Sequence, residues 1–289
     1  MSPERITGKE CFVRVWDQRK DAEMLCLHWT REEPKTQVQL AFREHWKLFQ
    51  EIIAQEPPRG RRCLELGAGR ATMSMYFADA GWDCTLVDIS DAVLEHAQQV
   101  YRKYGLSARP VVADAIETGL PDGSYDVCVS IGLLEHLPDL KGALEEQLRL
   151  LASGGILLAY VVPDRECDAQ KGWQWLNEVL RIYYELATGA APESLEKPDV
   201  YRSDAGIGDY QRLLEDMPIR DVKGSGVYPL PMLSPSTRFP FTLNPSEVEE
   251  TLVKHFTRIL ERRAQATRKN PWLCPEEYGQ AFLVWGRRR

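Results

Sequence analysis

The chain has 289 residues, of which 44% are hydrophobic, so it is long enough to bury a substantial core. Its 43 acidic and 36 basic residues leave a formal net charge of -7, which argues against a broad nucleic-acid-binding surface. The seven cysteines form no C-x-x-C pair, and no apolar run is long enough to span a membrane. These features predict a soluble cytoplasmic protein with free, buried cysteines and without membrane partners.

The first half of the chain alternates short apolar strands with helices. After a polar N-terminal stretch, an amphipathic helix is predicted over residues 36–55, and the segment Pro57-Pro58-Arg59-Gly60 ends it. The predicted strands cover residues 62–66, 83–87, 109–113, 125–130 and 156–162. Helices are predicted at residues 70–80, at 90–104, and from Asp139 to the Ser153-Gly154-Gly155 turn. This order predicts a parallel, doubly wound α/β sheet.

The second half is less regular. Aromatic-rich residues 164–190 predict a helix, and the next elements are a loop over 191–207, a short helix over 210–215 and a strand over 219–228. Asn244 and Pro245 predict the start of a long helix, with Asn244 as the N-cap and Pro245 at the first helical position. A final strand is predicted over residues 278–285, and the three arginines that follow at 287–289 are expected to be disordered.

The most informative segment is Cys63-Leu64-Glu65-Leu66-Gly67-Ala68-Gly69-Arg70-Ala71, which predicts a buried strand, a glycine turn and a helix. Gly67 and Gly69 allow the backbone to turn sharply and to approach a ligand closely. The following helix directs its free N–H groups toward that ligand. Glu65 is unusual, because a carboxylate near the end of an apolar strand needs a partner. It favours a ligand with cationic or hydroxyl groups over a bare pyrophosphate.

Three acids, Glu65, Asp88 and Asp114, are predicted at the carboxyl ends of three successive strands, where open α/β sheets bind their ligands. An acid after the second strand can accept hydrogen bonds from both ribose hydroxyls, and one after the third can accept from the adenine amine. An adenosine with a short, amine-bearing tail fits these positions. A nicotinamide dinucleotide competes for the same glycines, but Thr72 occupies its third glycine position and Glu65 replaces an apolar residue.

An ordered series of motifs resembles the class I S-adenosylmethionine-dependent methyltransferases, of the group that includes the ubiquinone and menaquinone biosynthesis enzymes. The motifs, which span residues 60–163, are Glu65-Leu66-Gly67-Ala68-Gly69, Leu86-Val87-Asp88-Ile89-Ser90, Ala113-Asp114-Ala115, Tyr125-Asp126-Val127-Cys128, Leu134-Glu135-His136-Leu137-Pro138-Asp139 and Leu150-Leu151-Ala152-Ser153-Gly154-Gly155. The resemblance implies a seven-stranded, mostly parallel Rossmann-like sheet whose last strand is antiparallel. It also implies S-adenosylmethionine as the cofactor and methyl transfer to a small-molecule acceptor as the activity.

The resemblance carries eight cofactor contacts over to this chain. The residues expected at the methionine arm are Glu65, Gly67 and Gly69, and Asp88 is expected at the ribose. Ile89, Asp114 and Ala115 are expected at the adenine, and Ile131 is expected near the methyl donor. Methyl transfer requires the protein mainly to align the nucleophile, the methyl group and the sulfur and to exclude water, because the sulfonium already activates the carbon.

His136 is the one candidate base within these motifs. Its expected role is either direct catalysis or the shaping of the acceptor pocket, and Glu135 is expected to be a local hydrogen-bond partner. In some quinone O-methyltransferases this pair joins a further acid in binding a metal. That acid would fall at Gly132 here, so no metal site is predicted.

Residues 1–56 are predicted to form a helical cap on a methyltransferase domain over 57–289, with acceptor-side insertions at 164–207 and 229–275. The aromatic residues expected to line the acceptor pocket are Trp16, Trp29, Tyr160, Trp173 and Tyr201. The segment Ser130-Ile131-Gly132-Leu133 lacks the Pro-Pro-aromatic motif of enzymes that methylate nucleic-acid amino groups. The alternatives left open are a protein or RNA methyltransferase and a non-catalytic module that binds S-adenosylmethionine.

Overall fold

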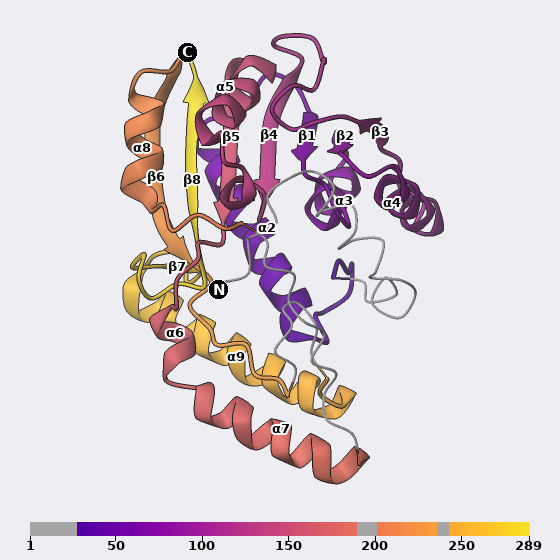
Figure 1. The fold of residues 1–289 in the computed structure, drawn as a ribbon, viewed down its shortest axis with the longest axis vertical. Helices are drawn as coiled ribbons and strands as arrows, with labels where there is room; N and C mark the ends of the chain where they lie inside the picture. The colour runs from indigo at the N-terminus through magenta and orange to yellow at the C-terminus, as the bar shows by residue number, and fades with distance from the viewer. Residues whose placement is uncertain (1–27, 190–200, 236–242) are drawn as a thin grey trace, which may run out of the picture.

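The computed structural model describes residues 28–189, 201–235 and 243–289 (Figure 1). Its centre is an eight-stranded sheet with the order β3-β2-β1-β4-β5-β8-β6-β7. The strands are β1 (Arg62–Leu66), β2 (Asp83–Asp88), β3 (Arg109–Val112), β4 (Tyr125–Ile131), β5 (Leu151–Val161), β6 (Ile219–Val227), β7 (Leu273–Cys274) and β8 (Ala281–Arg288). The helical elements are α2 (Gln37–Gln55), α3 (Thr72–Asp79), α4 (Asp91–Lys103), the 3-10 turn η1 (Leu134–His136), α5 (Leu140–Leu150), α6 (Asp168–Lys171), α7 (Gln174–Thr188), α8 (Ile207–Glu215) and α9 (Ser246–Thr267).

The sheet is mostly parallel, as the sequence predicts. Strands β3, β2, β1, β4 and β5 pair in parallel, and β8 runs antiparallel between β5 and β6. The expected doubly wound sheet with an antiparallel last strand is therefore confirmed. The two-residue strand β7, which pairs antiparallel with the end of β6, is an addition that the sequence does not predict.

Alternating side chains divide the core into two layers, one on each face of the sheet. Val127 and Val129 of β4 point to the face that is covered by α2, α3, α4 and α9. Cys128, which lies between them, points to the face that is covered by α5 and α8. Because successive strand residues face opposite sides, the continuous apolar runs of the sequence are buried on both faces.

Gly154 and Gly155 lie inside strand β5 and do not have the predicted role. We expected Ser153-Gly154-Gly155 to close the helix, but α5 ends at Leu150 and β5 begins at the next residue. Gly154 has φ 78°, and the pairing register between β4 and β5 shifts between Tyr125 and Val127. The glycines therefore accommodate an irregularity inside a strand, which is a common use of glycine in sheets.

The start of α9 also differs from the prediction. Pro245, and not Asn244, precedes the first helical residue, and no side chain caps the helix. The Asn244 amide instead donates hydrogen bonds of 2.7 Å to the carbonyl of Leu233 and to Oε1 of Glu249. Hydrogen bonds to the segment before the helix and to its first turn have thus replaced the capping interaction that the sequence pattern favours.

The C-terminal arginines are ordered, contrary to the prediction. Arg287 and Arg288 belong to β8, and Nη1 of Arg288 donates a 2.7 Å hydrogen bond to the carbonyl of Arg149. The prediction that the cysteines are free and buried is confirmed for five of them, which are Cys63, Cys84, Cys128, Cys167 and Cys274. The other two, at positions 11 and 26, lie outside the described residues.

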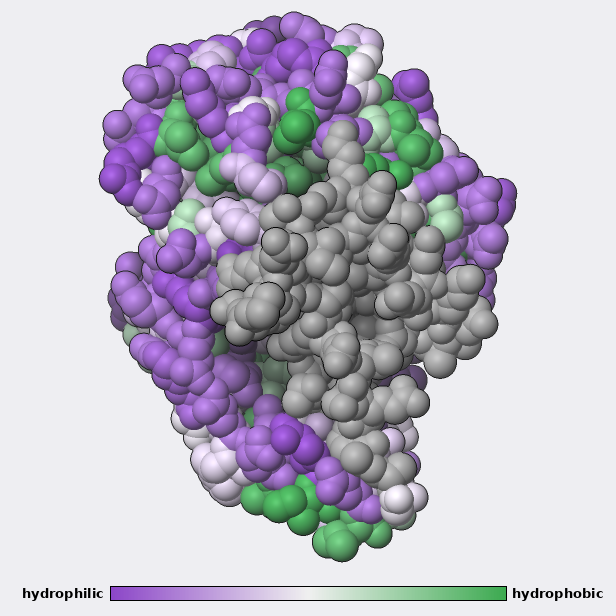
Figure 2. Space-filling model, viewed as in Figure 1, coloured by the Kyte–Doolittle hydropathy of each residue, from purple (hydrophilic) through white to green (hydrophobic). Residues whose placement is uncertain are grey.

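Helix α7 presents apolar side chains to solvent. The structure has two helices, α6 and α7, where the sequence predicts one, and no residue of α7 is buried. Trp175 is 63% exposed and Leu186 is 81% exposed. Figure 2 shows apolar side chains at the end of the molecule where α7 lies in Figure 1. Within the described residues, no helix combines the length and the apolar character needed to cross a bilayer.

Candidate functional site

The register of the parallel strands brings three predicted site residues to one edge of the sheet. Leu66, the last residue of β1, pairs with Val87 of β2 and with Ser130 of β4. The next residue of each strand or turn, namely Gly67, Asp88 and Ile131, therefore lies at the same level along the carboxyl edge. This is the edge at which open α/β sheets bind ligands.

The turn after β1 takes a backbone conformation that favours glycine. Gly67 has φ 62° and Gly69 has φ 51°. A Cβ atom built on Gly67 would lie 2.7 Å from Cδ1 of Leu133, so a side chain at this position would require Leu133 to move. Ala71 is also left-handed, with φ 52°, which the sequence did not reveal because alanine rarely adopts this conformation.

The protein itself supplies one hydrogen-bond partner for the Glu65 carboxyl group. Its side chain is buried, and Oε2 accepts a 2.9 Å hydrogen bond from the backbone N–H of Ser74 in α3. Burial raises the pKa of Glu65 to about 7, against the lowering effect of the Ser74 hydrogen bonds, and the charge of Asp88 adds to the increase. A cationic ligand at this edge would favour the ionised carboxylate.

Asp88 is anchored by backbone donors at the end of β2. Its Oδ2 accepts from the N–H of Gly69 at 2.9 Å, and its Oδ1 accepts from the N–H of Ser90 at 3.0 Å. Burial raises the pKa of Asp88, while these backbone hydrogen bonds lower it. Each carboxylate oxygen can accept more than one hydrogen bond, so Asp88 retains acceptor capacity for a pair of hydroxyl groups.

Asp114 lies one strand further along the same edge. The N–H of Ala113 donates 3.0 Å to the carbonyl of Asp88, which continues the pairing of β3 with β2 beyond Val112. Oδ1 of Asp114 accepts from the N–H of Ile116 at 3.2 Å, and the residue is partly exposed. The other three residues expected at the cofactor are likewise partly exposed, namely Ile89, Ala115 and Ile131.

His136 is held by Tyr201, which lies 65 residues further along the chain. Its Nδ1 lies 2.7 Å from the carbonyl oxygen of Tyr201, which can only accept, so Nδ1 carries the proton and donates. This tautomer leaves the basic lone pair on Nε2, which lies 3.9 Å from Oε1 of Glu135. Burial lowers the pKa of His136, so its neutral form is favoured.

Glu135 joins two chain segments to η1. Its Oε1 accepts from the N–H of Val162 at 3.2 Å, and its backbone carbonyl accepts from the N–H of Ser203 at 2.7 Å. Burial raises the pKa of this carboxyl to about 7. Glu135 is thus a hydrogen-bond partner, as expected, but its partners Val162 and Ser203 lie far along the chain and are not local. Within the described part of the chain, no group of three or more His, Cys, Asp or Glu residues could hold a metal ion.

The expected acceptor-side aromatics divide into two groups. The carbonyls of Tyr160 and Tyr201 accept from the N–H of Gly132 and from His136, so these two residues lie against the connection after β4. Trp29 is 1% exposed and packs edge-on against Tyr76 and Tyr104, which makes it a core residue. Trp173 is 43% exposed before α7, and Trp16 lies outside the described residues.

A buried aromatic cluster behind Tyr160 was not predicted. His45 of α2 packs edge-on against Tyr160, Tyr228 and Trp272, at centroid distances of 4.5, 6.1 and 5.3 Å. Tyr228 has φ 65°, an uncommon conformation for a residue with a bulky side chain. The sequence did contain a signal for His45, because it lies three residues after Phe42 on the apolar stripe of the predicted helix.

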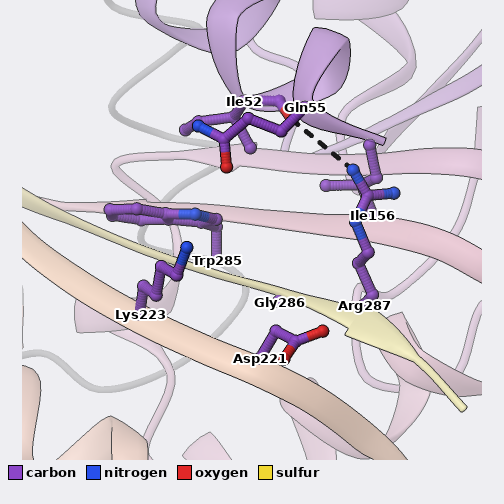
Figure 3. Close-up of a pocket in the computed structure, with 8 residues that line it drawn as sticks. All are labelled: Ile52, Gln55, Ile156, Asp221, Lys223, Trp285, Gly286 and Arg287. Atoms are coloured by element: carbon purple, nitrogen blue, oxygen red, sulfur yellow. Dashed lines mark hydrogen bonds between the residues drawn. The ribbon is translucent and has the colours of Figure 1, made fainter. Parts of the chain in front are cut away.

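The pocket drawn in Figure 3 is a separate feature. It lies between the end of α2 and strands β5, β6 and β8, and its lining residues are Ile52, Gln55, Ile156, Asp221, Lys223, Trp285, Gly286 and Arg287. Arg287 donates to the carbonyl of Ile52 at 3.5 Å across one side of it. Its volume of about 30 Å³ accommodates about two water molecules, and none of the predicted site residues lines it.

Comparison with known proteins identifies the central part of the chain. Residues 64–159 match the family model of the methyltransferase domain. The chain contains a class I S-adenosylmethionine-dependent methyltransferase domain. The domain's relatives include a ubiquinone biosynthesis O-methyltransferase of Methylococcus capsulatus, which is 32% identical over 144 residues, or 49% of this chain and 54% of the relative. An ajmaline N-methyltransferase of Rauvolfia serpentina is 30% identical over 180 residues, or 61% of this chain and 57% of the relative.

A solved structure with a cyclase title shares the fold of this chain. The solved structure of the [4+2]-cyclase SpnF has a TM-score of 0.54 and 16% identity, and the match covers 98% of this chain and 97% of SpnF. At this identity the likeness shows the fold alone. The chain also spans only about half the length of the two curated relatives.

Proposed function

We propose that the protein transfers a methyl group from S-adenosylmethionine to a small-molecule acceptor. The observation that carries this proposal is the arrangement at Asp88, whose carboxylate is anchored by the N–H of Gly69 at the end of β2. The glycine turn lies beside it on β1, and Asp114 follows β3. Acceptor groups at these three places fit an adenosine whose tail extends over the glycine turn.

The residues of this edge would divide the cofactor among them. Asp88 would accept hydrogen bonds from the ribose hydroxyls, with Ile89 against the adenine, and Asp114 and Ala115 would contact the adenine edge. The other expected contacts are Glu65, Gly67 and Gly69 at the methionine arm and Ile131 near the sulfonium. The cofactor, when bound, supplies a methyl group already activated by its positively charged sulfur.

The protein's own task is then to orient the acceptor and to exclude water. His136 lies after β4 with its Nδ1 proton engaged by Tyr201, so Nε2 is the atom suited to accept a hydrogen bond or a proton from an acceptor. Tyr160 and Tyr201 lie against the same connection and would line the acceptor side. A small acceptor agrees with the relatives, whose names include enzymes of ubiquinone biosynthesis and ajmaline methylation, and with the net charge of -7.

Calorimetric titration with S-adenosylmethionine and S-adenosylhomocysteine tests the cofactor part of the proposal. Both ligands should bind the wild-type protein. Asp88→Asn should raise both dissociation constants by about tenfold or more, because a hydrogen bond to a charged group contributes about 1.5–3 kcal/mol. Asp83→Asn is the matched control, since Asp83 is exposed at the opposite end of the same strand. Absence of binding, or equal binding by Asp88→Asn, would contradict the proposal.

A panel of small acceptors tests the transfer itself. Purified protein is incubated with S-adenosylmethionine and with phenols, amines or thiols, and production of S-adenosylhomocysteine is measured. Turnover with one acceptor class supports the proposal and names the nucleophile. Cofactor binding without turnover on any of them would favour the non-catalytic module, whereas turnover only with a protein or RNA acceptor would favour the macromolecular alternative.

A further inference from the structure

Arg70 follows the glycine turn directly and is fixed in relation to the expected ribose site. The N–H of the preceding residue, Gly69, donates to Asp88, and the N–H of the following residue, Ala71, donates to the carbonyl of Ala68. The backbone on both sides of Arg70 is therefore restrained. The backbone of Arg70 therefore lies next to the glycine turn and close to the anchored Asp88 carboxylate.

The Arg70 side chain contacts a histidine from a distant part of the chain. Nη1 of Arg70 lies 2.9 Å from Nε2 of His28. A guanidinium can only donate, so Nε2 of His28 accepts and its proton resides on Nδ1. His28 is buried and lies parallel to the ring of Phe42 in α2, at a centroid distance of 5.8 Å.

The histidine is a neutral partner. Burial, and to a lesser extent the charge of Arg70, lowers the pKa of His28 to about 3. A neutral acceptor fixes the direction of the guanidinium without cancelling its positive charge. His28 therefore does not neutralise the positive charge of Arg70, as a carboxylate in its place would.

The order of the strands indicates which part of the cofactor meets this charge. Along the sheet edge, Asp114 of the β3 connection, Asp88 of β2 and the glycine turn of β1 follow one another. If the adenine lies at Asp114 and the ribose at Asp88, the amino-acid tail of the cofactor lies over the glycine turn. Arg70 is the only lysine or arginine in the connections that follow β1, β2, β3 and β4, which are residues 67–71, 89–90, 113–124 and 132–139.

We propose that Arg70 binds the carboxylate of the cofactor's methionine tail and that His28 positions the Arg70 guanidinium for this contact. The inference rests on the proposed function. Arginine suits the role, because its planar array of donors matches a carboxylate. The expected acids of the site, Glu65, Asp88 and Asp114, cannot serve a carboxylate when they are ionised, since they offer only acceptors.

Two ligands that share the adenosine but differ in the tail separate this role from a structural one. S-adenosylhomocysteine carries the carboxylate, whereas 5′-methylthioadenosine lacks the amino-acid part. In calorimetric titrations, Arg70→Gln should raise the dissociation constant of S-adenosylhomocysteine by about 10- to 100-fold, the range of a charge-assisted hydrogen bond. The affinity for 5′-methylthioadenosine should stay within about twofold, because that ligand makes no use of the guanidinium.

Variants of His28 test the positioning role. His28→Ala should weaken binding of S-adenosylhomocysteine several-fold with little effect on 5′-methylthioadenosine, and His28→Gln, which keeps a neutral acceptor, should restore most of the affinity. Arg61→Gln is the control, because Arg61 is exposed just before the other end of β1. It should change neither dissociation constant.

Three results would overturn the inference. Unchanged binding of S-adenosylhomocysteine by Arg70→Gln would show that another group holds the carboxylate. Equal weakening of both ligands would assign Arg70 to the stability of the turn, and failure of His28→Gln to rescue would remove the role of His28. A wild-type protein that binds neither ligand would instead refute the proposed function itself.

Discussion

The indole N–H of Trp272 donates a 2.7 Å hydrogen bond to Nδ1 of His45, across 227 residues of sequence. The contact joins α2 to the segment between α9 and β7, behind Tyr160. Since Nδ1 accepts, the ring proton of His45 resides on Nε2, and burial lowers the pKa of His45 to about 3. The neutral histidine is thus part of the native structure.

His45→Phe should therefore change both the size and the pH dependence of the unfolding free energy. At pH 7.5 the variant should lose about 1–3 kcal/mol, because the Trp272 N–H remains buried without its acceptor. A histidine with a lowered native pKa stabilises the fold above pH 6.5, and this contribution is lost as the pH falls below 6.5. Between pH 7 and pH 5 the unfolding free energy of the wild type should fall by about 2 kcal/mol more than that of the variant.

Urea denaturation at pH 7.5 and pH 5 measures this difference. The stability gap between wild type and His45→Phe should be smaller at the lower pH. His255→Phe is the control, because His255 is exposed on α9, and its gap should be small at both pH values. A gap for His45→Phe that does not change with pH would show that protonation of His45 is not linked to unfolding.

The sequence predicts the sheet well, because strands buried on both faces leave a clear apolar pattern. The bounds of β1, Arg62–Leu66, agree with the prediction, and β2 and β4 each extend one residue beyond it. Errors occur where another contact replaces the preferred local one. Asn244 is a residue type that favours helix caps, but its amide bonds to Leu233 and Glu249, and the final arginines gain order from their place in β8.

Glu135→Gln should show the opposite pH dependence. A carboxyl whose native pKa is raised from 4.5 to about 7 prefers the neutral form in the folded state, so its ionisation destabilises the fold as the pH rises from 4.5 to 7. Glutamine keeps the acceptor for the Val162 N–H and cannot ionise. The stability of the variant relative to wild type should therefore rise by up to about 3 kcal/mol between pH 4.5 and pH 7.5.

The matched control for this measurement is Glu145→Gln, since Glu145 is exposed on α5. Its stability relative to wild type should vary little over the same pH range. If the gain for Glu135→Gln were absent, the carboxylate would be stabilised in the folded state by contacts that offset its burial.

Gly67→Ala should destabilise the protein and weaken cofactor binding together. The backbone at Gly67 has φ 62°, and an added Cβ would meet Cδ1 of Leu133 at 2.7 Å. The left-handed conformation costs about 1–2 kcal/mol for alanine, and the clash adds about 1–3 kcal/mol. Gly105→Ala is the control, because Gly105 has φ 67° with open space around it and should show the first cost alone.

The Leu133→Ala change distinguishes the two contributions at Gly67. Combined with Gly67→Ala, it removes the clashing atom, so the double variant should recover part of the stability that Gly67→Ala loses. Thermal unfolding of the two single variants and the double variant measures this coupling. Strict additivity would show that the Leu133 contact does not set the requirement for glycine.

The candidate site could be predicted only in part from the sequence. Strand ends and glycine turns are local features, so the positions of Glu65, Asp88 and Asp114 follow from the motif order. The environment of His136 does not, because its partner Tyr201 lies 65 residues away. Likewise, no local pattern brings His28 to Arg70, and the aromatic content of the chain does not reveal that Trp29 and Tyr160 are both buried in the core.

His136→Ala should lower kcat/KM for the acceptor by about 100-fold or more, since about 100-fold is the smaller end of the range that a base or a positioned hydrogen bond contributes. The dissociation constant of S-adenosylmethionine should stay within about twofold, because the expected cofactor residues lie at or just after the ends of β1, β2, β3 and β4 and do not include His136. His255→Ala should change neither value.

The pH profile then separates the two roles of His136. If Nε2 accepts a proton during transfer, wild-type kcat/KM should fall as the pH drops through the lowered pKa of His136, and His136→Gln should lose this dependence together with most of the activity. If His136 only shapes the pocket, His136→Gln should retain substantial activity and raise the KM for the acceptor more than it lowers kcat. Full turnover by His136→Ala would exclude both roles, and the acceptor would then have to be oriented by the aromatic residues around Tyr160 and Tyr201.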